Sequence, residues 1–252
     1  MTNKDNEIKR HEIYRQAAEY CYDEKNRKLP EGYSLIDSVH TKNGLDASIL
    51  KNDNDIIIAY QGTQSKNDYI DDVKIYYGNI SKQCKEGREL YKEVKKMYPD
   101  LEITTTGHSL GGAISQYVSA VEWCKSVNFN PLGAREVLMN NIEAFDTTGI
   151  VNYCNPRDWV SSANAEKQLG VCYEVTSKGF TSKKEAGLKA HHDIESMEDL
   201  RSRKLISREE LHEKYNNYAH QGTEHHVSGY TRDDGTNVKS YTRGCGPNHV
   251  HK

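Results

Sequence analysis

A serine stands between two glycines in the segment GHSLG at residues 107–111, which has the pattern G-x-S-x-G. A β-branched run at residues 101–107 predicts a strand before it, and apolar residues at helical spacing after Gly111 predict a helix. Where this pattern joins a strand to a helix, the sharp turn lifts the serine hydroxyl above the sheet edge as a nucleophile. The alternative is a glycine-rich turn whose serine caps the next helix. We predict that Ser109 is a nucleophile for acyl transfer.

A serine needs two partners for this chemistry. Serine is a weak nucleophile at neutral pH, so a histidine must take its proton and a carboxylate must orient that histidine. In chains with this kind of turn, the carboxylate and then the histidine follow the serine. Asp158 comes directly after a predicted strand and is the expected carboxylate, whereas Asp146 precedes that strand and is less well placed. His191 and His192 are both candidates for the base.

Acyl transfer also needs two backbone N–H donors that hold the developing oxyanion. One donor comes from the residue after the nucleophile, which is Leu110, and the other comes from the loop after an earlier central strand. The unbroken apolar run at residues 56–60 predicts such a strand, because a strand buried on both faces is apolar throughout. Thr63 follows this strand and is the expected second donor.

Strands and helices alternate along the chain. Charged segments with apolar residues at helical spacing predict helices over residues 7–23 and 81–98, the second ending before Pro99. Apolar and β-branched runs predict strands at residues 33–39, 45–51, 56–60, 101–107, 126–130, 149–154 and 170–175. Segments long enough for helices separate the later runs. We therefore expect an α/β domain with a mostly parallel central sheet that helices cover on both faces.

The last part of the chain differs in character. An S-x-x-E capping box at residues 207–210 starts a predicted helix. Beyond it, VSGYTR at 227–232 recurs as VKSYTR at 238–243 with Asp-Gly between the two arms, which predicts a β-hairpin. We expect one α/β domain at residues 1–206 and a small helix-plus-hairpin appendage at residues 207–252. The tyrosines and arginines of the arms fit either a protein partner or packing against the domain edge.

Composition and charge exclude several classes of protein. The chain has 252 residues and a formal net charge of −3, and it lacks the concentrated basic surface that binding to nucleic acid needs. It shows neither the apolar segment of a signal peptide nor a run of about 18 apolar residues that could cross a bilayer. We expect a soluble protein made in the cytoplasm, with export by a dedicated secretion apparatus left open.

Cysteines and histidines form no pattern typical of a metal or redox site. None of the six cysteines belongs to a C-x-x-C pair, so we expect reduced and mostly buried thiols. The spacing of His225, His226, Cys245, His249 and His251 fits no usual zinc-ligand pattern. We expect no metal and no cofactor.

Several motifs, in order along the chain, resemble those of the class 3 lipases and their bacterial relatives, including phospholipases of the A1 type. The segments are YQGT at 60–63, TGHSLGGAIS at 106–115, FNPLG at 129–133 and NPRDWV at 155–160. HDIESM, which begins at His192, is similar to the family segment that carries the base, and this favours His192 over His191. The resemblance covers about residues 30–200.

This resemblance implies an α/β-hydrolase fold and a serine acyl hydrolase that cleaves carboxylic esters of lipids. It implies a triad of Ser109, His192 and Asp158, with the amides of Thr63 and Leu110 as the oxyanion hole. Two other functions remain open: a soluble carboxylesterase, and a non-catalytic binding protein that keeps the fold. The presence of all three residue types of the triad in order speaks against the binding protein.

Lysines gather near the predicted base, at Lys178, Lys183, Lys184 and Lys189. Near an anionic membrane surface each ammonium group contributes about 1 kcal/mol of binding free energy. The cluster favours phospholipids over triglycerides or soluble esters as substrates, with the membrane surface as a partner. The alternative is a solvated loop without a binding role.

Overall fold

The computed structural model describes residues 2–62, 80–140, 144–178 and 191–219, and the backbone of four short strands between residues 225 and 243. Thr63 and the lysines at positions 183, 184 and 189, whose roles the sequence predicts, lie outside the described residues.

A single sheet of eight strands forms the centre of the larger part of the chain, and its strands lie in the order in which the chain makes them. They are β1 Ser34–His40, β2 Asp46–Lys51, β3 Asp55–Tyr60, β4 Glu102–His108, β5 Lys125–Phe129, β6 Ile150–Cys154, β7 Val171–Glu174 and β8 Lys204–Ile206. The run from β3 to β7 is parallel, whereas the pairs β1–β2, β2–β3 and β7–β8 are antiparallel. The mostly parallel α/β sheet that the sequence predicts is confirmed.

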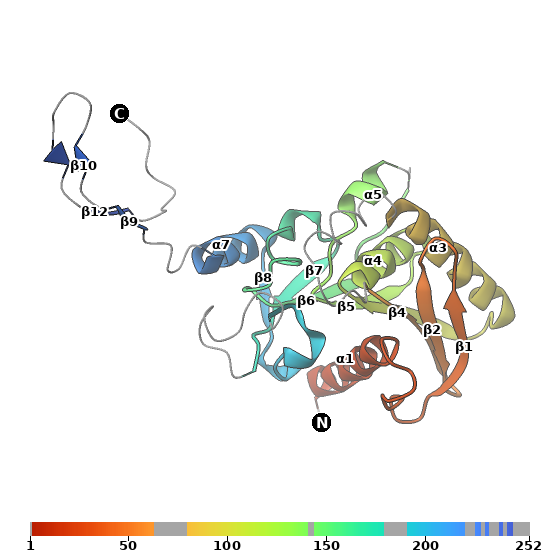
Figure 1. Cartoon of the computed structure of the whole chain (residues 1–252). Helices are drawn as coiled ribbons and strands as arrows, with labels where there is room; N and C mark the ends of the chain where they lie inside the picture. The colour runs from red at the N-terminus through yellow and green to blue at the C-terminus, as the bar shows by residue number, and fades with distance from the viewer. Residues whose placement is uncertain are drawn as a thin grey trace. The chain divides into compact units, whose positions relative to one another are not determined.

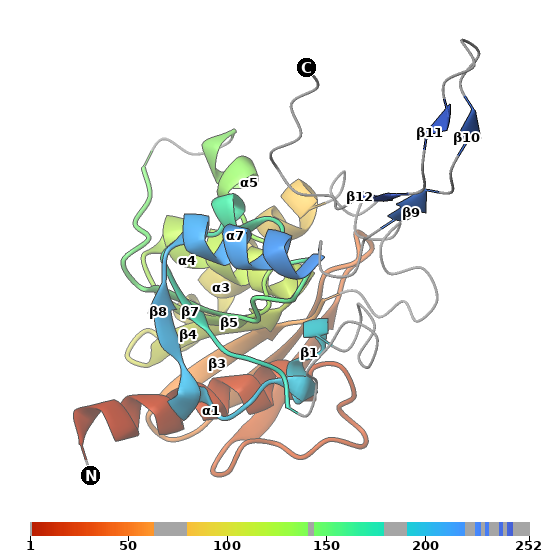
Figure 2. The same cartoon turned by 90° about the vertical axis from the view of Figure 1, so that its left-hand side faces the viewer.

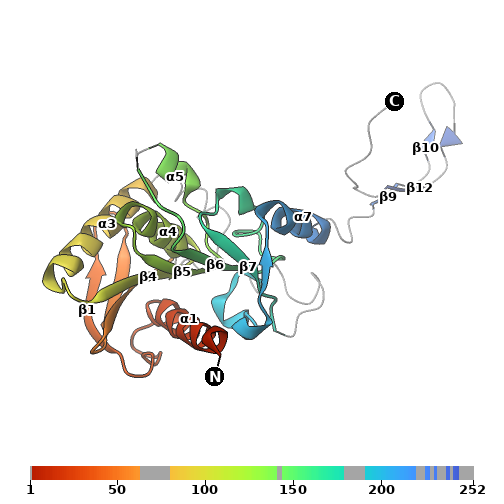
Figure 3. The ribbon, with the colours of Figure 1, turned by 180° about the vertical axis from the view of Figure 1, so that it is seen from behind.

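Helices cover both faces of this sheet. The long ones are α1 Asn3–Tyr20, α3 Ile80–Met97 and α4 Leu110–Glu122. α1 lies on one face, and α3 and α4 lie together on the other (Figures 1 and 3), an arrangement that Figure 2 shows after a turn of 90°. The shorter ones are α5 Arg135–Met139, η1 Ala165–Lys167, η2 Ile194–Ser196, η3 Leu200–Ser202 and α7 Arg208–Ala219. Between β5 and β7, where we expected segments long enough for full helices, the described residues form only α5 and η1.

The two-sided covering explains the apolar sequence of β3, whose residues are all buried. Ile56, Ile58 and Tyr60 belong to the core that α3 and α4 share with the sheet. Ile57 and Ala59 belong to the second core, which α1 shares with the sheet. Because side chains alternate between the faces of a strand, a strand between two cores must be apolar at every position.

The threonine run before the elbow forms the buried strand β4. Thr104, Thr105 and Thr106 are at most 3% exposed. Thr105 Oγ1 donates to the Ser115 carbonyl oxygen at 3.3 Å, and Thr106 Oγ1 donates to the Val127 carbonyl oxygen at 2.6 Å. A polar sequence can therefore lie in the middle of the sheet, because its hydroxyl groups have partners there.

The chain divides into two compact units, Met1–Tyr215 and Asn216–Lys252. The units divide later in the chain than the boundary that we expected after residue 206, because the first half of α7 packs with the larger unit. Leu211 on α7 is fully buried in a cluster with Ile206 and Cys154. Whether the C-terminal piece acts as a separate domain stays a prediction.

The smaller unit contains short antiparallel strand pairs. β10 (Tyr230–Thr231) pairs with β11 (Asn237–Val238), and β9 (His225–Val227) pairs with β12 (Tyr241–Arg243). This pairing joins the two similar arms that the sequence predicts as a hairpin. The Asp-Gly turn expected between the arms lies outside the described residues.

No helix among the described ranges is long and apolar enough to cross a membrane. The cysteines in those ranges are free thiols, as the sequence predicts, and all are buried except the partly exposed Cys124. The buried ones are Cys21, Cys84, Cys154 and Cys172.

Candidate active site

Ser109 occupies a tight turn between β4 and α4. Its backbone has φ 56° and ψ −125°, a conformation that residues with a side chain rarely adopt. Gly107 and Gly111 allow the chain to come this close to itself. A Cβ atom on Gly107 would overlap the Gly111 carbonyl group, and a Cβ atom on Gly111 would overlap the carbonyl oxygen of Tyr60 at the end of β3. A strained serine between a strand and a helix is the geometry of a nucleophile elbow.

Asp158 lies in the loop after β6 and is fully buried. Its Oδ1 accepts hydrogen bonds from His192 Nδ1 at 2.9 Å and from the Val160 N–H at 3.1 Å. Its Oδ2 accepts from the Ser161 N–H at 2.9 Å and from the Ser161 hydroxyl at 2.6 Å. Burial raises the pKa of Asp158, but His192 and the Ser161 donors lower it further, so the pKa lies below its ordinary value. An ionised carboxylate at Nδ1 holds a proton on that nitrogen and orients the ring, so that Nε2 is the nitrogen that takes the proton in general-base catalysis.

The histidine that contacts Asp158 is His192 and not His191. The His192 side chain is buried, and its ring centroid lies 4.5 Å from that of His108, the residue before the elbow serine. His191 is also buried, but its Nδ1 lies 3.1 Å from the hydroxyl oxygen of Ser177. The geometry therefore agrees with the choice that the family resemblance favours.

His108 links three parts of the site. Its Nε2 donates to the His192 carbonyl oxygen at 2.8 Å, since a carbonyl oxygen can only accept. Its Nδ1 must then accept from the Tyr22 hydroxyl at 2.9 Å, and the Tyr22 oxygen accepts from the Gly62 N–H at 3.1 Å. Burial, with a smaller effect of His192, lowers the pKa of His108 to about 3, so the ring is neutral as this pattern requires. The chain of bonds runs from the loop after β3, through the elbow, to His192.

Asn130 joins the loops after β5 and β6 to the histidine segment. Its Nδ2 donates to the carbonyl oxygens of His192 at 2.9 Å and His191 at 3.2 Å, and its Oδ1 accepts from the Asn155 N–H at 2.9 Å. No separate role was predicted from the sequence for Asn130 or Asn155. Each stands between the end of a parallel strand and a proline. This repeated placement is the signal that could have identified them.

Of the two expected oxyanion donors, Leu110 lies among the described residues. Leu110 is the first residue of α4, so its N–H has no acceptor one turn earlier in the helix and lies at the positive end of the helix dipole. Thr63 lies outside the described residues. The two residues before it are anchored, because the Gln61 N–H donates to the Asp46 carbonyl oxygen at 2.9 Å and Gly62 donates to Tyr22. The oxyanion role of Leu110 and Thr63 stays a prediction.

Asp146, the weaker carboxylate candidate, has a different place. It precedes β6, at the end of the sheet opposite to the elbow, whereas the carboxylate that contacts His192 Nδ1 is that of Asp158. Its carboxylate accepts from the Thr148 N–H at 2.9 Å and from the Thr148 hydroxyl at 2.8 Å. Asp146 is a turn residue.

These groups gather at the carboxyl end of the parallel strands. They are a strained serine, an imidazole held by an ionised carboxylate, and the amino end of a buried helix. Such a set can carry an acyl group on the serine and release it to water. Within the described ranges, no cluster of histidine, cysteine and acidic side chains is arranged to hold a metal ion.

The sequence of this chain is similar to those of known phospholipases. The family model of the phospholipase-like group, described as a Tle-like phospholipase domain, matches residues 14–163. An extracellular phospholipase A1 from Serratia liquefaciens is 24% identical over 134 residues, which make up 50% of this chain and 42% of that protein. The chain therefore spans less than half of the length of this relative.

The fold of this chain is similar to those of solved lipase structures. The lipase of Rhizomucor miehei in its propeptide complex aligns with a TM-score of 0.53 at 16% identity, over 84% of this chain and 76% of that one. A triacylglycerol lipase whose catalytic centre is formed by a serine protease triad aligns with a TM-score of 0.52 at 17% identity, over 70% of this chain and 82% of the lipase. At these identities the likeness concerns the fold, and it is that of the α/β-hydrolase lipases.

Proposed function

Because the chain belongs to the family of Tle-like phospholipase domains, we propose that it is a serine esterase that hydrolyses carboxylic ester bonds of phospholipids. The observation that carries this proposal is the buried His192–Asp158 pair beside the strained Ser109. In our proposal Ser109 is the nucleophile, His192 the general base and Asp158 the residue that orients it.

The reaction proceeds through an acyl-enzyme. Ser109 Oγ attacks the ester carbonyl carbon while His192 Nε2 takes the hydroxyl proton, and Asp158 stabilises the imidazolium through Nδ1. The amides of Leu110 and Thr63 hold the negative oxygen of the tetrahedral intermediate. The intermediate collapses as His192 gives its proton to the departing alcohol. Water then attacks the acyl-enzyme by the same route and releases the fatty acid and Ser109.

Phospholipids are the proposed substrates for two reasons. The matching family model is described as a phospholipase domain, and the Serratia relative is named a phospholipase A1. The lysines that follow β7 lie close to the predicted base in the sequence, and their positive charge suits an anionic lipid surface. The name of the relative makes the ester at the sn-1 position of the glycerol the first bond to examine.

The test measures fatty acid release from phospholipid vesicles whose sn-1 and sn-2 chains carry different labels, and in parallel from short p-nitrophenyl esters. Ser109→Ala should abolish release from both. Ser202→Ala is the matched control, because Ser202 is exposed on η3 and outside the elbow. A fluorophosphonate should label the native protein at Ser109 and leave the Ser109→Ala protein unlabelled.

Each other outcome leads to a different function. Serine-dependent activity on the short esters alone would make the protein a soluble carboxylesterase. Neither turnover nor labelling would favour a binding protein that keeps the hydrolase fold. Release of the sn-2 chain alone would still support an esterase, but the bond that it cleaves would be the sn-2 ester and not the predicted sn-1 ester.

The place of action is a separate part of the proposal. The Serratia relative is named as extracellular, which favours action outside the producing cell, after export by a dedicated apparatus. Immunodetection of the native protein in culture medium and in lysate would separate this from action in the cytoplasm. Retention of all the protein inside intact cells under every growth condition would count against export.

A further inference from the structure

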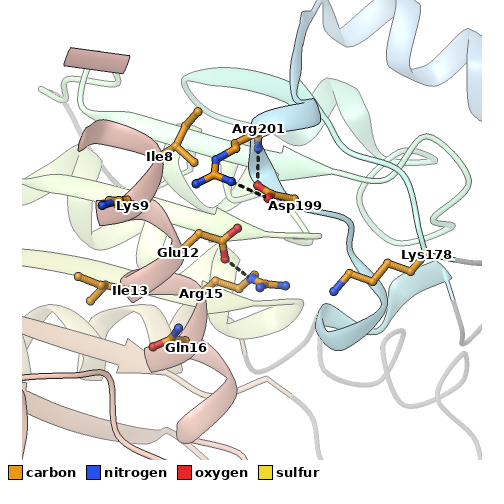
Figure 4. Close-up of a pocket in the computed structure, with 9 residues that line it drawn as sticks. All are labelled: Ile8, Lys9, Glu12, Ile13, Arg15, Gln16, Lys178, Asp199 and Arg201. Carbon is orange, nitrogen blue, oxygen red and sulfur yellow. Dashed lines mark hydrogen bonds and ion pairs between the residues drawn. The ribbon is translucent and has the colours of Figure 1, made fainter. Parts of the chain in front are cut away.

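A groove on the α1 face of the sheet has an excess of positive charge (Figure 4). It encloses about 390 Å³ between α1 on one side and Lys178 with the segment around η3 on the other. We call it the basic groove. Its charged residues are four cations and two carboxylates, namely Lys9, Arg15, Lys178, Arg201, Glu12 and Asp199. The chain as a whole has a net charge of −3, so this local excess stands out.

Both carboxylates of the basic groove already accept from donors. Glu12 accepts from Arg15 Nε at 2.7 Å through one oxygen and from the Leu200 N–H at 3.2 Å through the other. Asp199 accepts from the Arg201 N–H at 2.9 Å, and its second oxygen lies 3.5 Å from Arg201 Nη1. Among the residues that the structure describes, no carboxylate lies within ion-pair distance of the Lys178 ammonium. Arg15 Nη1 also lies 3.9 Å from a carboxylate oxygen of Glu19, so the positive charge that these acidic residues leave unbalanced is mainly that of Lys178.

Two of the cations converge across the groove. Figure 4 shows the Lys178 side chain extending from its loop toward the Arg15 guanidinium. Arg15 is only 17% exposed, and Glu12 at 2.7 Å and Glu19 at 3.9 Å offset part of its charge. An anion between Arg15 and Lys178 would be attracted by both cations. A guanidinium fork and an ammonium group together suit the oxygens of a phosphate.

The position of the groove relates it to the candidate active site. The Lys178 N–H donates to the Ser196 carbonyl oxygen at 2.7 Å, in the segment that follows His192. Ser177, the residue before Lys178, contacts His191 at 3.1 Å. An anion at Lys178 would therefore sit beside the segment that carries the predicted base.

We propose that the basic groove binds the phosphate of an anionic phospholipid headgroup. Arg15, Lys178 and Arg201 take the phosphate oxygens, and the side chains of Ile8 and Ile13 in the wall contact the apolar part of the same lipid. This inference rests on the proposed phospholipase function, because it supplies the surface on which such an enzyme works. The bound lipid holds the protein on the membrane and is not the molecule that is cleaved.

The test uses Ser109→Ala protein, so that vesicles stay intact and binding is measured without turnover. Co-sedimentation compares vesicles of phosphatidylcholine alone with vesicles that also contain phosphatidylglycerol. Lys178→Gln should weaken binding to the anionic vesicles about fivefold, and Lys9→Gln with Lys178→Gln about 25-fold. Lys96→Gln removes the same charge from an exposed position on α3, on the other face of the sheet, and should leave binding unchanged.

Two arms separate the sources of phosphate. Inorganic phosphate should displace the protein from anionic vesicles more than sodium chloride of equal ionic strength. It should also raise the melting temperature of the Ser109→Ala protein but not that of the Ser109→Ala protein that also carries Lys178→Gln. If phosphate raises the melting temperature through Lys178 while vesicle binding does not depend on Lys178, the groove binds free phosphate and the headgroup proposal is overturned.

Equal weakening by Lys178→Gln and Lys96→Gln would also overturn the proposal, because binding would then depend on net charge alone. Melting curves of both variants establish that they are folded before binding is compared. Failure of the esterase proposal would show in the hydrolysis assay. Since binding is measured on Ser109→Ala protein throughout, the binding result could be interpreted independently of that outcome.

Discussion

His108 donates through Nε2 to the backbone carbonyl oxygen of His192 at 2.8 Å, so the residue before the elbow serine holds the main chain of the predicted base. The bond has one direction, because the carbonyl can only accept. Tyr22 completes the arrangement by donating to Nδ1 at 2.9 Å. We therefore predict that His108 and Tyr22 act through His192, as positioning residues.

We expect Tyr22→Phe to lower kcat on short esters by about 10- to 100-fold with little change in KM, because a loosened base is misplaced in the transition state. The matched control is Tyr153→Phe. Tyr153 is a buried tyrosine whose hydroxyl lies 2.7 Å from Nδ1 of another buried histidine, His11. Steady-state kinetics and urea unfolding of both variants are compared. Equal losses of kcat at equal losses of stability would show that Tyr22 has only a structural role.

We expect Asn130→Asp to destabilise the fold by about 3 to 5 kcal/mol, since it replaces the amide that donates to two carbonyl oxygens with a buried negative charge that faces them, although Oδ1 keeps the Asn155 N–H as a donor. The affected bonds are those to His192 at 2.9 Å and His191 at 3.2 Å. The same substitution at the exposed Asn54 should change the free energy of unfolding by less than about 0.5 kcal/mol. Urea denaturation at neutral pH measures both, and a stable Asn130→Asp protein would contradict the bridging role of this amide.

Two buried histidines predict a loss of stability in acid. Burial lowers the pKa of His11 to about 4, and burial with His192 lowers that of His108 to about 3, from ordinary values of 6.5. Below pH 6.5 the unfolded chain binds these protons and the folded chain does not. The stabilisation present above that pH is therefore lost as the pH falls, by about 1.4 kcal/mol per pH unit for each histidine.

His11→Gln should remove one of these two contributions between pH 6.5 and about 4. Urea unfolding at a series of pH values gives the slope of the free energy of unfolding against pH. The variant should show a slope lower than that of the native protein by about 1.4 kcal/mol per pH unit. Identical slopes would mean that His11 does not titrate as its burial implies.

Trp123 ends α4 in the left-handed conformation, with φ 57° and ψ 38°, and its side chain is 69% exposed. Trp123→Gly should raise the free energy of unfolding by about 0.5 to 1 kcal/mol, because glycine adopts this conformation without strain. Met97→Gly, at the exposed last residue of α3, lacks this benefit and should lower stability. Thermal and urea unfolding test the pair, and a loss of stability in both would refute the strain at Trp123.

Local patterns predicted the elements and the elbow well. The apolar run of β3, the threonine run of β4 and the helical spacing after Gly111 each depend on neighbours in the sequence, and each lies where it was expected. The position of Asp158 could also be predicted, because the carboxyl ends of parallel strands meet at one edge of a sheet. The catalytic roles of these residues remain predictions.

Contacts between distant segments could not be predicted from the same patterns. Tyr22 reaches His108 from the end of α1, and nothing local to either residue indicates the other. The choice between His191 and His192 depended on the family resemblance, since adjacent histidines look alike until a fold directs one toward Asp158. The compact units divide after Tyr215 and not after residue 206, because Leu211 is buried with Ile206, a contact between a helix and an edge strand that no local pattern indicates.

The buried hydroxyl groups of β4 have a consequence for how the sheet is assembled. Thr105 and Thr106 find their acceptors on α4 and β5 only when the three elements are aligned as they are here. A slip of one residue would turn these hydroxyls to the opposite faces and leave buried polar groups without partners, at about 1–3 kcal/mol each. An all-valine strand would tolerate such a slip more easily. The threonines thus select one alignment during folding, and that alignment sets the height at which Ser109 emerges from the sheet.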